Sequence, residues 1–382
     1  MDKKIKVCFV AENSSEMAGS AQSLANLMIE LASHDVVPTL VSHKYSDQIK
    51  YANDHGIRTT IIPSIIGVYL KTPKGYLKRI IFKATEPIIL RLILNFLQKE
   101  KFDVIHMNSL DSSIVWAIAA KKLNIPYVWH LREYKDENVK FKLIDENKYL
   151  QIISNADEVI VISKDMQKYY EHCLNRNCCL IYNGFKIDTY YSDCQNKLLD
   201  ETIKCVIIGR VVEDKRQMDA ILAIKKLIKM GYKFHLDIIG YRDSDKYEKD
   251  IKKYIECHDL SANINLIPYT YEIRNSIKDS DIGLMCSTRE AFGRVTIEYK
   301  LAGLLAIGAN TGGTPEIIED GVNGLLYEMG DIENLTNQLL WVANNRLKAK
   351  TILQEGQKQA IKEFNIENTA NKVLNVYKTV ID

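Results

Sequence analysis

Short runs rich in Val and Ile alternate with longer segments of helical period along the chain, and the alternation starts again after a polar interruption. Such runs indicate buried strands, and their regular succession with amphipathic helices is typical of parallel sheets wound by helices. In the first half, strands are predicted at 5–10, 37–42, 104–107, 127–130, 159–162 and 179–182. In the second half, they are predicted at 204–209, 234–240, 264–267, 282–286 and 304–307. The sequence therefore predicts an α/β fold.

The interruption follows neither the period of a strand nor that of a helix, so a linker is predicted at 187–202. We expect two Rossmann-like parallel-sheet domains, 1–186 and 203–364, which face each other across a cleft. In such domains ligands lie at the carboxyl ends of the strands. Residues 365–382 are predicted to form an amphipathic helix that can pack back on the first domain.

Charge and composition exclude several classes of protein. The 382 residues contain 51 Lys and Arg against 49 Asp and Glu, and this net charge of +2 lacks the basic field of a dedicated nucleic-acid binder. No C-x-x-C pair marks a zinc site. No uncharged apolar segment reaches the ~18 residues of a membrane-spanning helix, and the N-terminus lacks a signal-peptide pattern. A cytoplasmic protein is expected.

The segment 287–303 carries the clearest chemical pattern. A buried strand ends at 286, a loop with Glu290 follows, and a helix is predicted to begin near Gly293. Unpaired backbone N–H groups at such a helix start are a ready phosphate site, and they would come from Phe292, Gly293, Arg294 and Val295. Glu298, about one turn into the helix, is expected to bind sugar hydroxyls. The same glutamates are also compatible with an ordinary solvated helix start.

Two cations lie near the predicted end of the first strand of the second domain. Arg210 follows that strand and Lys215 precedes the next helix, so both are placed to neutralise a diphosphate. Taken alone, they could also be solvent-facing loop charges. In a turn-rich loop farther along, Gly312 and Gly313 would permit close approach of the backbone to a ligand.

Together these motifs, with Pro315-Glu316 and Asn323-Gly324, resemble those of retaining family 4 glycosyltransferases (glycosyl transferases group 1) of GT-B fold. The resemblance covers nearly the whole second domain. It implies that Arg210 and Lys215 bind the diphosphate of a nucleotide sugar, which in this family is commonly a UDP-sugar.

The resemblance also implies roles for four further residues. Glu298 would take the ribose hydroxyls, Glu290 would contact the transferred sugar, and Thr270 would lie beside the base. His130, at the end of a strand of the first domain, corresponds to a histidine that faces the donor sugar. In the glycine loop after the first strand, only Gly19 matches. Glu290 and His130 are thus the predicted catalytic residues.

The expected activity is transfer of the sugar to a hydroxyl of a glycan or of a lipid-linked acceptor, as in the synthesis of cell-surface polysaccharides. No cofactor or metal is assigned. Asp243 and Asp245, like Asp279 and Asp281, form a D-x-D pattern, but the first pair suits a helix start and the second precedes a strand.

Residues 71–101 carry eight Lys or Arg and two Glu, a local excess of eight minus two, or +6. Leu77, Ile80, Ile81, Ala84 and Ile88 form an apolar stripe there, and Pro87 is expected to divide the segment into two helices. Basic flanks on an apolar face suit an anionic membrane surface, so peripheral membrane association is one interpretation. The other is that the stripe is buried in the domain.

Three alternatives remain at this stage: a sugar-nucleotide epimerase of the same architecture, an inactive protein that only binds nucleotide sugar, and a nicotinamide oxidoreductase. Because no G-x-G-x-x-G follows either first strand, the oxidoreductase is disfavoured.

Overall fold

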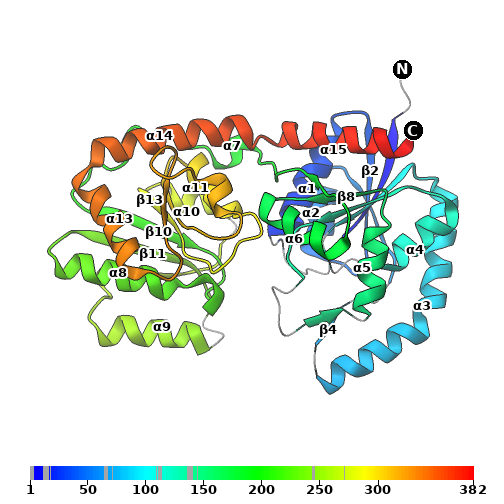
Figure 1. Cartoon of the computed structure of the whole chain (residues 1–382), viewed down its shortest axis with the longest axis horizontal. Helices are drawn as coiled ribbons and strands as arrows, with labels where there is room; N and C mark the ends of the chain where they lie inside the picture. Colours follow the sequence, from blue (N-terminus) through cyan, green and yellow to red (C-terminus); the bar gives the residue numbers. More distant parts are fainter. Residues whose placement is uncertain are drawn as a thin grey trace. The chain divides into compact units, whose positions relative to one another are not determined.

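The computed structural model describes residues 4–11, 17, 19–63, 68–70, 72–108, 110, 114–135, 141–143, 145–242, 246–270 and 272–382. It divides into two compact units, 1–185 with 366–382, and 186–365 (Figure 1). Residues 187–202, which the sequence predicts as a linker, lie within the second unit, where Cys194 and Leu198 are part of the hydrophobic core. This core membership could not be read from the polar composition of the segment.

The first unit is built around a parallel sheet. Its described strands are ordered β3-β2-β1-β5-β6-β8-β9, and β4 pairs with β7 in a separate antiparallel ribbon. The bounds are β1 Ile5–Val10, β2 Val36–Ser42, β3 Arg58–Ile61, β4 Val68–Leu70, β5 Val104–Asn108, β6 Tyr127–Leu131, β7 Phe141–Leu143, β8 Glu158–Val161 and β9 Cys179–Leu180. The helices are α1 Gly19–Ala32, α2 Asp47–Asp54, α3 Pro73–Glu100, α4 Ile114–Leu123, α5 Glu146–Ser154, α6 Lys164–Leu174 and α15 Ile366–Ile381.

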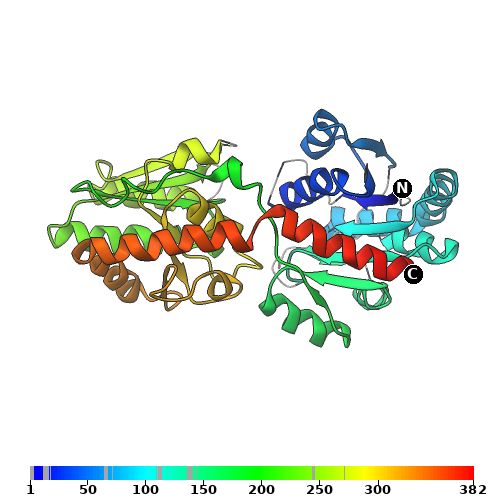
Figure 2. The ribbon, with the colours of Figure 1, turned by 90° about the horizontal axis from the view of Figure 1, so that it is seen from above.

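Helices α1, α2 and α15 cover one face of this sheet. Met28 of α1 and Tyr377 of α15 are fully buried in one cluster with Phe9 of β1. Figures 1 and 2 show α15 lying beside α1. The C-terminal helix, although distant in sequence, is therefore part of the first unit, because its apolar stripe completes the core on that face.

Helix α3 is a single helix in the structure, so the predicted division at Pro87 is wrong. Proline removes a backbone N–H and usually kinks or breaks a helix, at a cost of about 3 kcal/mol. Here Phe82 before the proline and Ile89 and Ile93 after it are all buried, so packing on both sides holds the helix together. Figure 1 shows the ribbon of α3 bending along its length.

The second unit contains a parallel sheet whose described strands are ordered β12-β11-β10-β13-β14-β15. The strands are β10 Ile203–Ile208, β11 Phe234–Tyr241, β12 Ile264–Pro268, β13 Ile282–Met285, β14 Leu305–Ala309 and β15 Leu325–Tyr327. The helices are α7 Ile187–Tyr190, the short 3-10 helix η1 Glu213–Lys215, α8 Gln217–Lys229, α9 Lys246–Cys257, α10 Ile273–Ile277, α11 Arg294–Leu301, α12 Thr314–Ile317, α13 Ile332–Asn344 and α14 Arg346–Glu363.

Alternate residues of β10 enter two different cores. Cys205 and Ile207 pack with residues of α8, α9, α13 and α14, whereas Val206 packs on the opposite face with Ile277 of α10 and Tyr299 of α11. A strand with both sides buried is what a parallel sheet covered by helices on each face requires. The near-continuous apolar runs of the sequence have this physical cause.

Candidate functional site

The carboxyl ends of β10, β13 and β14 meet at one edge of the second sheet. Because these three strands are parallel neighbours, the loops that follow them emerge at the same edge. The loops contain Arg210 and Lys215, then Glu290 with the start of α11, and then Gly312 with Gly313. Residues that are about 100 positions apart in sequence are thereby brought together.

Hydrogen bonds connect these loops directly. The backbone N–H of Thr288 donates to the carbonyl of Asp214 at 2.9 Å, and the Thr311 hydroxyl donates to the carbonyl of Thr288 at 3.0 Å. The N–H of Gly313 donates to the carbonyl of Glu290 at 2.8 Å. The loop that carries Glu290 is therefore held on both sides.

Gly312 and Gly313 lie in this contact between the two loops. A Cβ on Gly312, whose φ is +57°, would lie 2.5 Å from the carbonyl oxygen of Glu290, and one on Gly313 would lie 2.9 Å from the Cα of Phe292. Only glycine allows the two loops to approach this closely, so these residues position Glu290 through the backbone.

Lys215 and Glu290 form an ion pair at this edge through Nζ and Oε1. Both side chains are partly accessible, so the pair is close to solvent. The neighbouring cation Arg216 is engaged elsewhere, since its guanidinium donates to both carboxylate oxygens of Asp219 at 2.7 and 3.2 Å. Arg210 is exposed and forms no ion pair with another residue in the described part of the chain.

The start of α11 borders the same edge. Gly293 adopts a left-handed conformation, with φ of 89°, as the residue before the helix, and no side chain among the described residues caps the helix start. The Phe292 side chain is buried and packs edge-on against Phe364, with ring centroids 5.9 Å apart. Phe292 and Gly293 can therefore offer backbone groups to a ligand, together with the first N–H groups of Arg294 and Val295.

Glu298 is buried on α11, with 7% of its surface exposed. Its carboxylate lies 3.3 Å from the guanidinium of Arg294, one turn earlier, and accepts a hydrogen bond from Tyr190. Burial raises the pKa of Glu298 above its usual range, and these two partners counteract that effect. A carboxylate has about four lone-pair positions, so further acceptor capacity remains for hydroxyl groups.

Tyr299 fixes α11 relative to the end of β10. Its buried hydroxyl accepts the backbone N–H of Ile208 at 2.8 Å, and its ring fills the space left by Gly283, where a Cβ would lie 2.2 Å away. This contact places the helix start and the loop of Arg210 at fixed positions. The pairing of a strand Gly with a helix Tyr was not anticipated from the sequence.

Thr270 lies near the end of β12 and makes a local contact. Its hydroxyl accepts the backbone N–H of Glu272 at 3.0 Å. Beside it, the guanidinium of Arg242 lies over the ring of Tyr269, 5.2 Å from the centroid. A flat aromatic surface thus adjoins the residue that is predicted to lie beside a base.

In the first unit, His130 near the end of β6 is 1% exposed. Arg132, two residues farther, points to the same side and donates to His130 Nδ1 at 3.3 Å and to Asn108 Oδ1 at 2.6 Å. Asn183, beyond β9, accepts a third bond from Arg132. Sequence reasoning missed this network; the spacing of two between His130 and Arg132 was the available signal. Gly19 is the exposed first residue of α1.

Of the two D-x-D patterns, Asp243 and Asp245 lie outside the described residues. Asp281 has a backbone role, because its two carboxylate oxygens accept the N–H groups of Leu198 and Lys204 at 2.7 and 2.9 Å. These bonds join the start of β10 to the loop before β13.

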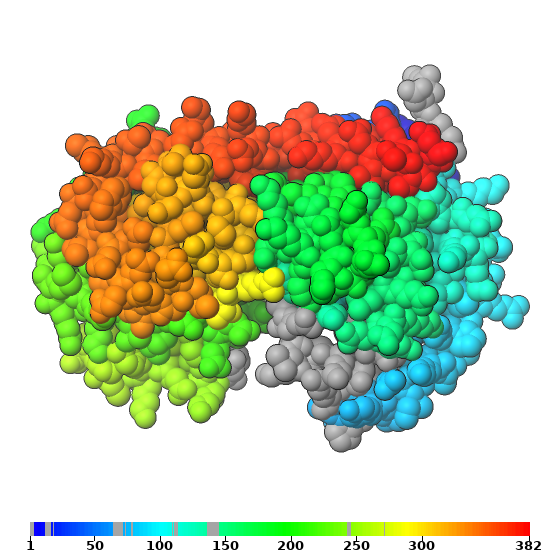
Figure 3. Space-filling view, viewed as in Figure 1, coloured from blue at the N-terminus to red at the C-terminus, as the bar shows by residue number. Residues whose placement is uncertain are grey.

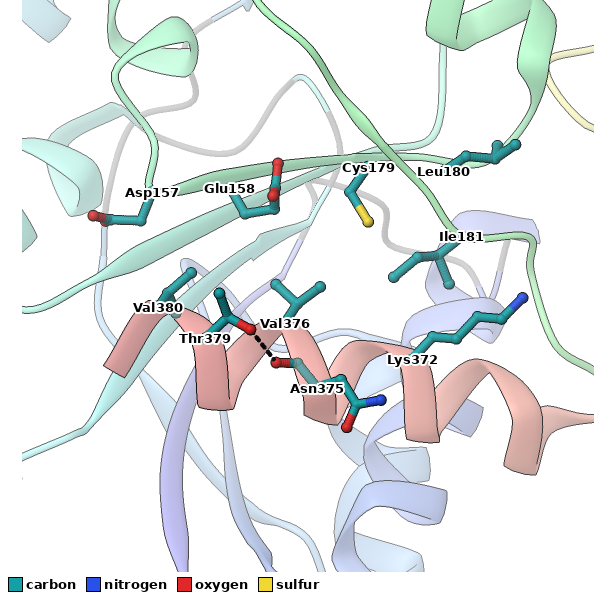
Figure 4. A pocket seen from close by; sticks show the side chains of 10 residues that line it. All are labelled: Asp157, Glu158, Cys179, Leu180, Ile181, Lys372, Asn375, Val376, Thr379 and Val380. Atoms are coloured by element: carbon teal, nitrogen blue, oxygen red, sulfur yellow. Dashed lines mark hydrogen bonds between the residues drawn. The ribbon is translucent and has the colours of Figure 1, made fainter. Parts of the chain in front are cut away.

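A cavity of about 610 Å³ lies in the first unit, between the first residues of β8 and β9 and the C-terminal half of α15 (Figure 4). Asp157, Glu158 and Lys372 contribute its charged side chains. None of the predicted site residues lines it. It is therefore separate from the carboxyl ends of the strands, where the predicted residues lie.

Two family models match the chain. The model described as Glycosyltransferase Family 4 matches residues 17–189, and the model described as Glycosyl transferases group 1 matches residues 193–359. Together they span most of both units.

Curated relatives agree with these matches. The capsular polysaccharide biosynthesis glycosyltransferase CapM of Staphylococcus aureus is 21% identical over 77% of this chain and 80% of its own length. The UDP-Gal:alpha-D-GlcNAc-diphosphoundecaprenol alpha-1,3-galactosyltransferase of Escherichia coli is 22% identical over 74% of this chain and 76% of its own.

Among solved structures, HepE of Anabaena in complex with UDP has the same fold. It superposes with a TM-score of 0.80 over 98% of this chain and all of its own, at 19% sequence identity.

Proposed function

Since the chain belongs to the family 4 glycosyltransferases of group 1 and has the GT-B fold, we propose that it transfers a sugar from a UDP-sugar to a hydroxyl of a glycan or lipid-linked acceptor, with retention of anomeric configuration. The second unit would bind the donor and the first unit the acceptor. The proposed setting is the synthesis of a cell-surface polysaccharide on the cytoplasmic side of the membrane.

The Lys215–Glu290 ion pair beside the start of α11 is the observation that carries this proposal. A nucleotide sugar joins a dianionic diphosphate to a neutral sugar rich in hydroxyl groups. A cation and a helix start suit the diphosphate, and a carboxylate suits the hydroxyls. A site in which a cation and a carboxylate are in contact therefore suits the point where the diphosphate is joined to the sugar.

The remaining predicted residues take roles around that junction. Exposed Arg210 adds a second cation for the diphosphate, and Glu298 receives the ribose hydroxyls. Thr270 is assigned to the base, and Gly19 at the start of α1 is assigned to the donor. His130 contacts the transferred sugar.

Chemistry then requires that the bond between the anomeric carbon and the phosphate oxygen breaks. Positive charge develops on the sugar and negative charge on the departing diphosphate. Lys215, Arg210 and the N–H groups at the start of α11 stabilise the second charge. We assign this stabilisation to the chain's own cations and dipoles, without a metal ion.

Retention is proposed to arise from attack on the face that the diphosphate leaves, with a phosphate oxygen taking the acceptor's proton. The alternative is a covalent intermediate on Glu290. The resemblance to retaining family 4 glycosyltransferases favours same-face attack over this alternative. Glu290 would orient the sugar.

Two comparisons support UDP as the nucleotide. The galactosyltransferase of Escherichia coli is named for UDP-Gal, and HepE of Anabaena was solved with UDP. The same galactosyltransferase is named for a diphosphoundecaprenol-linked acceptor, which supports a lipid-linked acceptor for this chain.

Helix α3 supports association with a membrane surface. The apolar stripe predicted there is exposed: Ile80 and Ile88 each have 65% of their surface accessible, and Leu77 and Ile81 are also exposed. Leu92, which was not part of the predicted stripe, is exposed as well. The core-facing residues of α3 belong to a different face, so the stripe is not part of the interior. In Figure 3, atoms of α3, in light blue, lie on the molecular surface.

Charge indicates which partner fits this stripe. Lys74, Lys83 and Arg91 are exposed on the same helix, whereas Glu86 is paired with Lys148 of α5 at 3.1 Å. Apolar side chains flanked by cations match the interface of an anionic bilayer, at about 1 kcal/mol per cation. Across the described residues, no helix is both long and apolar enough to span a bilayer. We therefore propose peripheral docking through α3.

The test of the proposed function is a thermal-stability screen of the purified chain with UDP, GDP and ADP sugars, followed by transfer assays with the stabilising donor. Stabilisation by a UDP-sugar and release of UDP are expected. Stabilisation without turnover in the presence of lipid-linked acceptors would identify a binding protein, and an epimerised donor would identify an epimerase.

A further inference from the structure

Arg132 occupies a buried position where three strand ends of the first unit meet. It directly follows β6 and is 7% exposed. Its Nε donates to Asn108 Oδ1 at the end of β5, and its Nη1 donates to Asn183 Oδ1 beyond β9. Its Nη2 lies 3.3 Å from His130 Nδ1. Both amides present their oxygen atoms to the guanidinium, so its orientation is fixed.

The contact with Nδ1 determines where His130 carries its proton. A guanidinium is always protonated and has donors only, with no acceptor. A proton on Nδ1 would face an N–H of Arg132, so Nδ1 must be the acceptor and the imidazole proton must reside on Nε2. Burial and the neighbouring Arg132 and His106 hold the pKa of His130 well below its usual range, so the ring stays neutral.

The Nε2 atom of His130 is buried and has no hydrogen-bond partner among the described residues. A buried N–H without an acceptor is unfavourable, and native structures rarely keep one unless a ligand or water completes it. His130 also pairs in register with Asn108, at the carboxyl edge of the sheet, where α/β domains bind ligands. The orphan group therefore belongs to a residue at the sheet edge where ligands of α/β domains bind.

We propose that Arg132 is a positioning residue that fixes His130 as the Nε2–H tautomer, so that His130 meets the substrate as a hydrogen-bond donor and not as a base. The acceptor of this bond is an oxygen of the ligand. The identification of this ligand as the nucleotide sugar rests on the proposed function. The proposed tautomer does not depend on that function.

The tautomer can be measured without substrate, by long-range proton–nitrogen NMR on full-length protein with ¹⁵N-labelled histidines. His130→Asn identifies the His130 signals by their loss. The expected pattern is a protonated Nε2 and an unprotonated Nδ1 in the unmodified chain. Arg132→Met is expected to produce a mixture of tautomers, and Arg132→Lys, which retains a donor, is expected to preserve the pattern.

The matched control is Arg58→Met, which removes an exposed guanidinium paired with Glu100 in the same unit and is expected to leave the His130 signals unchanged. A proton on Nδ1 in the unmodified chain overturns the proposal, as does an unchanged pattern in Arg132→Met. If Arg132→Met does not fold, Asn183→Ala, which releases one anchor of Arg132, takes its place with the same expected mixture.

Measurements of turnover then show whether His130 acts as a hydrogen-bond donor or as a base. His130→Gln retains an N–H donor and is expected to keep transfer within about tenfold, whereas His130→Phe is expected to lose about 100-fold or more. Equal losses in both variants would indicate a base and contradict the donor role. Should the chain transfer no sugar at all, the proposed function fails, while the NMR result still decides the role of Arg132.

Discussion

Lys215 and Glu290 form an ion pair that joins the loop after β10 to the loop after β13, across 75 positions of sequence. The pair places the cation that we assign to the diphosphate against the carboxylate that we assign to the sugar. Binding of a nucleotide sugar would insert its own charges into this contact, so the two residues should respond to substitution in opposite ways.

Replacement of Lys215 removes the cation and leaves Glu290 to repel the diphosphate. Lys215→Met is expected to weaken UDP binding by about 10- to 100-fold, which corresponds to one charge-assisted contact. Isothermal titration calorimetry with UDP measures the affinity of each variant. The matched control is Lys204→Met, a lysine paired with Asp200 in the same unit, which is expected to retain the affinity. Unchanged affinity in Lys215→Met would remove the diphosphate assignment.

Glu290→Gln keeps the shape of the side chain and removes its charge. Lys215 is then available to phosphate alone, so UDP affinity is expected to stay the same or to rise. Transfer is expected to fall by about 100-fold or more, because the sugar is no longer held by a carboxylate. Full turnover in this variant would contradict the placement of Glu290 beside the sugar.

Glu298 is predicted to recognise the ribose, and a comparison of UDP with 2′-deoxy-UDP tests this. The unmodified chain is expected to favour UDP by about tenfold, since a lost hydroxyl leaves a buried acceptor unsatisfied. In Glu298→Ala this preference should disappear. Glu333→Ala, which breaks the ion pair with Lys226 on the surface, serves as the control. A preference that survives in Glu298→Ala would assign the ribose elsewhere.

His106 is expected to make the first unit sensitive to acid. Burial lowers its pKa to about 3, whereas an unfolded chain has the ordinary value of 6.5. Between these values the unfolded state binds more protons, so stability falls as the pH drops below 6.5. Relative to neutral pH, this residue alone is expected to lower the free energy of unfolding by about 2 kcal/mol at pH 5.

Urea unfolding at pH 7.5 and pH 5, followed in the unmodified chain and in His106→Gln, measures the contribution of His106. The variant should lose less stability on acidification than the unmodified chain. An identical loss in both would show that other groups cause the acid sensitivity.

Docking through α3 is tested by sedimentation with vesicles. The chain is expected to bind vesicles that contain phosphatidylglycerol more strongly than vesicles of phosphatidylcholine alone. Ile80→Ser with Ile88→Ser, and separately Lys74→Gln with Lys83→Gln, should each reduce this binding. Leu347→Ser, at an exposed leucine of α14, is the control. If the unmodified chain forms dimers and the variant Ile80→Ser with Ile88→Ser does not, the stripe is instead an interface with a second copy of the chain.

Much of the fold could be predicted from the sequence, because buried parallel strands read as continuous apolar runs. The strands beginning at Ile5, Tyr127 and Phe234 were placed within one residue at both ends. Short strands such as β4, β7 and β15 were not predicted, since three residues carry too little periodicity to stand out.

For the candidate site, the sequence indicated residue types but not the contacts between them. The residue types at Lys215 and Glu290 indicated phosphate and sugar chemistry, but their pairing depends on how β10 and β13 are aligned. The close contact of the glycines at 312 and 313 with the backbone of the neighbouring loop was likewise not predicted. Pairwise packing of this kind is decided by tertiary structure, which a local pattern does not encode.

Proton NMR of the reaction decides whether the chain is a retaining transferase that uses a UDP-sugar. The full-length chain is incubated with the UDP-sugar that stabilises it, with and without a lipid-linked acceptor, and the anomeric signals are followed from the first minutes. We expect release of UDP together with a product whose new anomeric centre has the configuration of the donor. A product of inverted configuration, or a donor converted to its epimer without release of UDP, would contradict it.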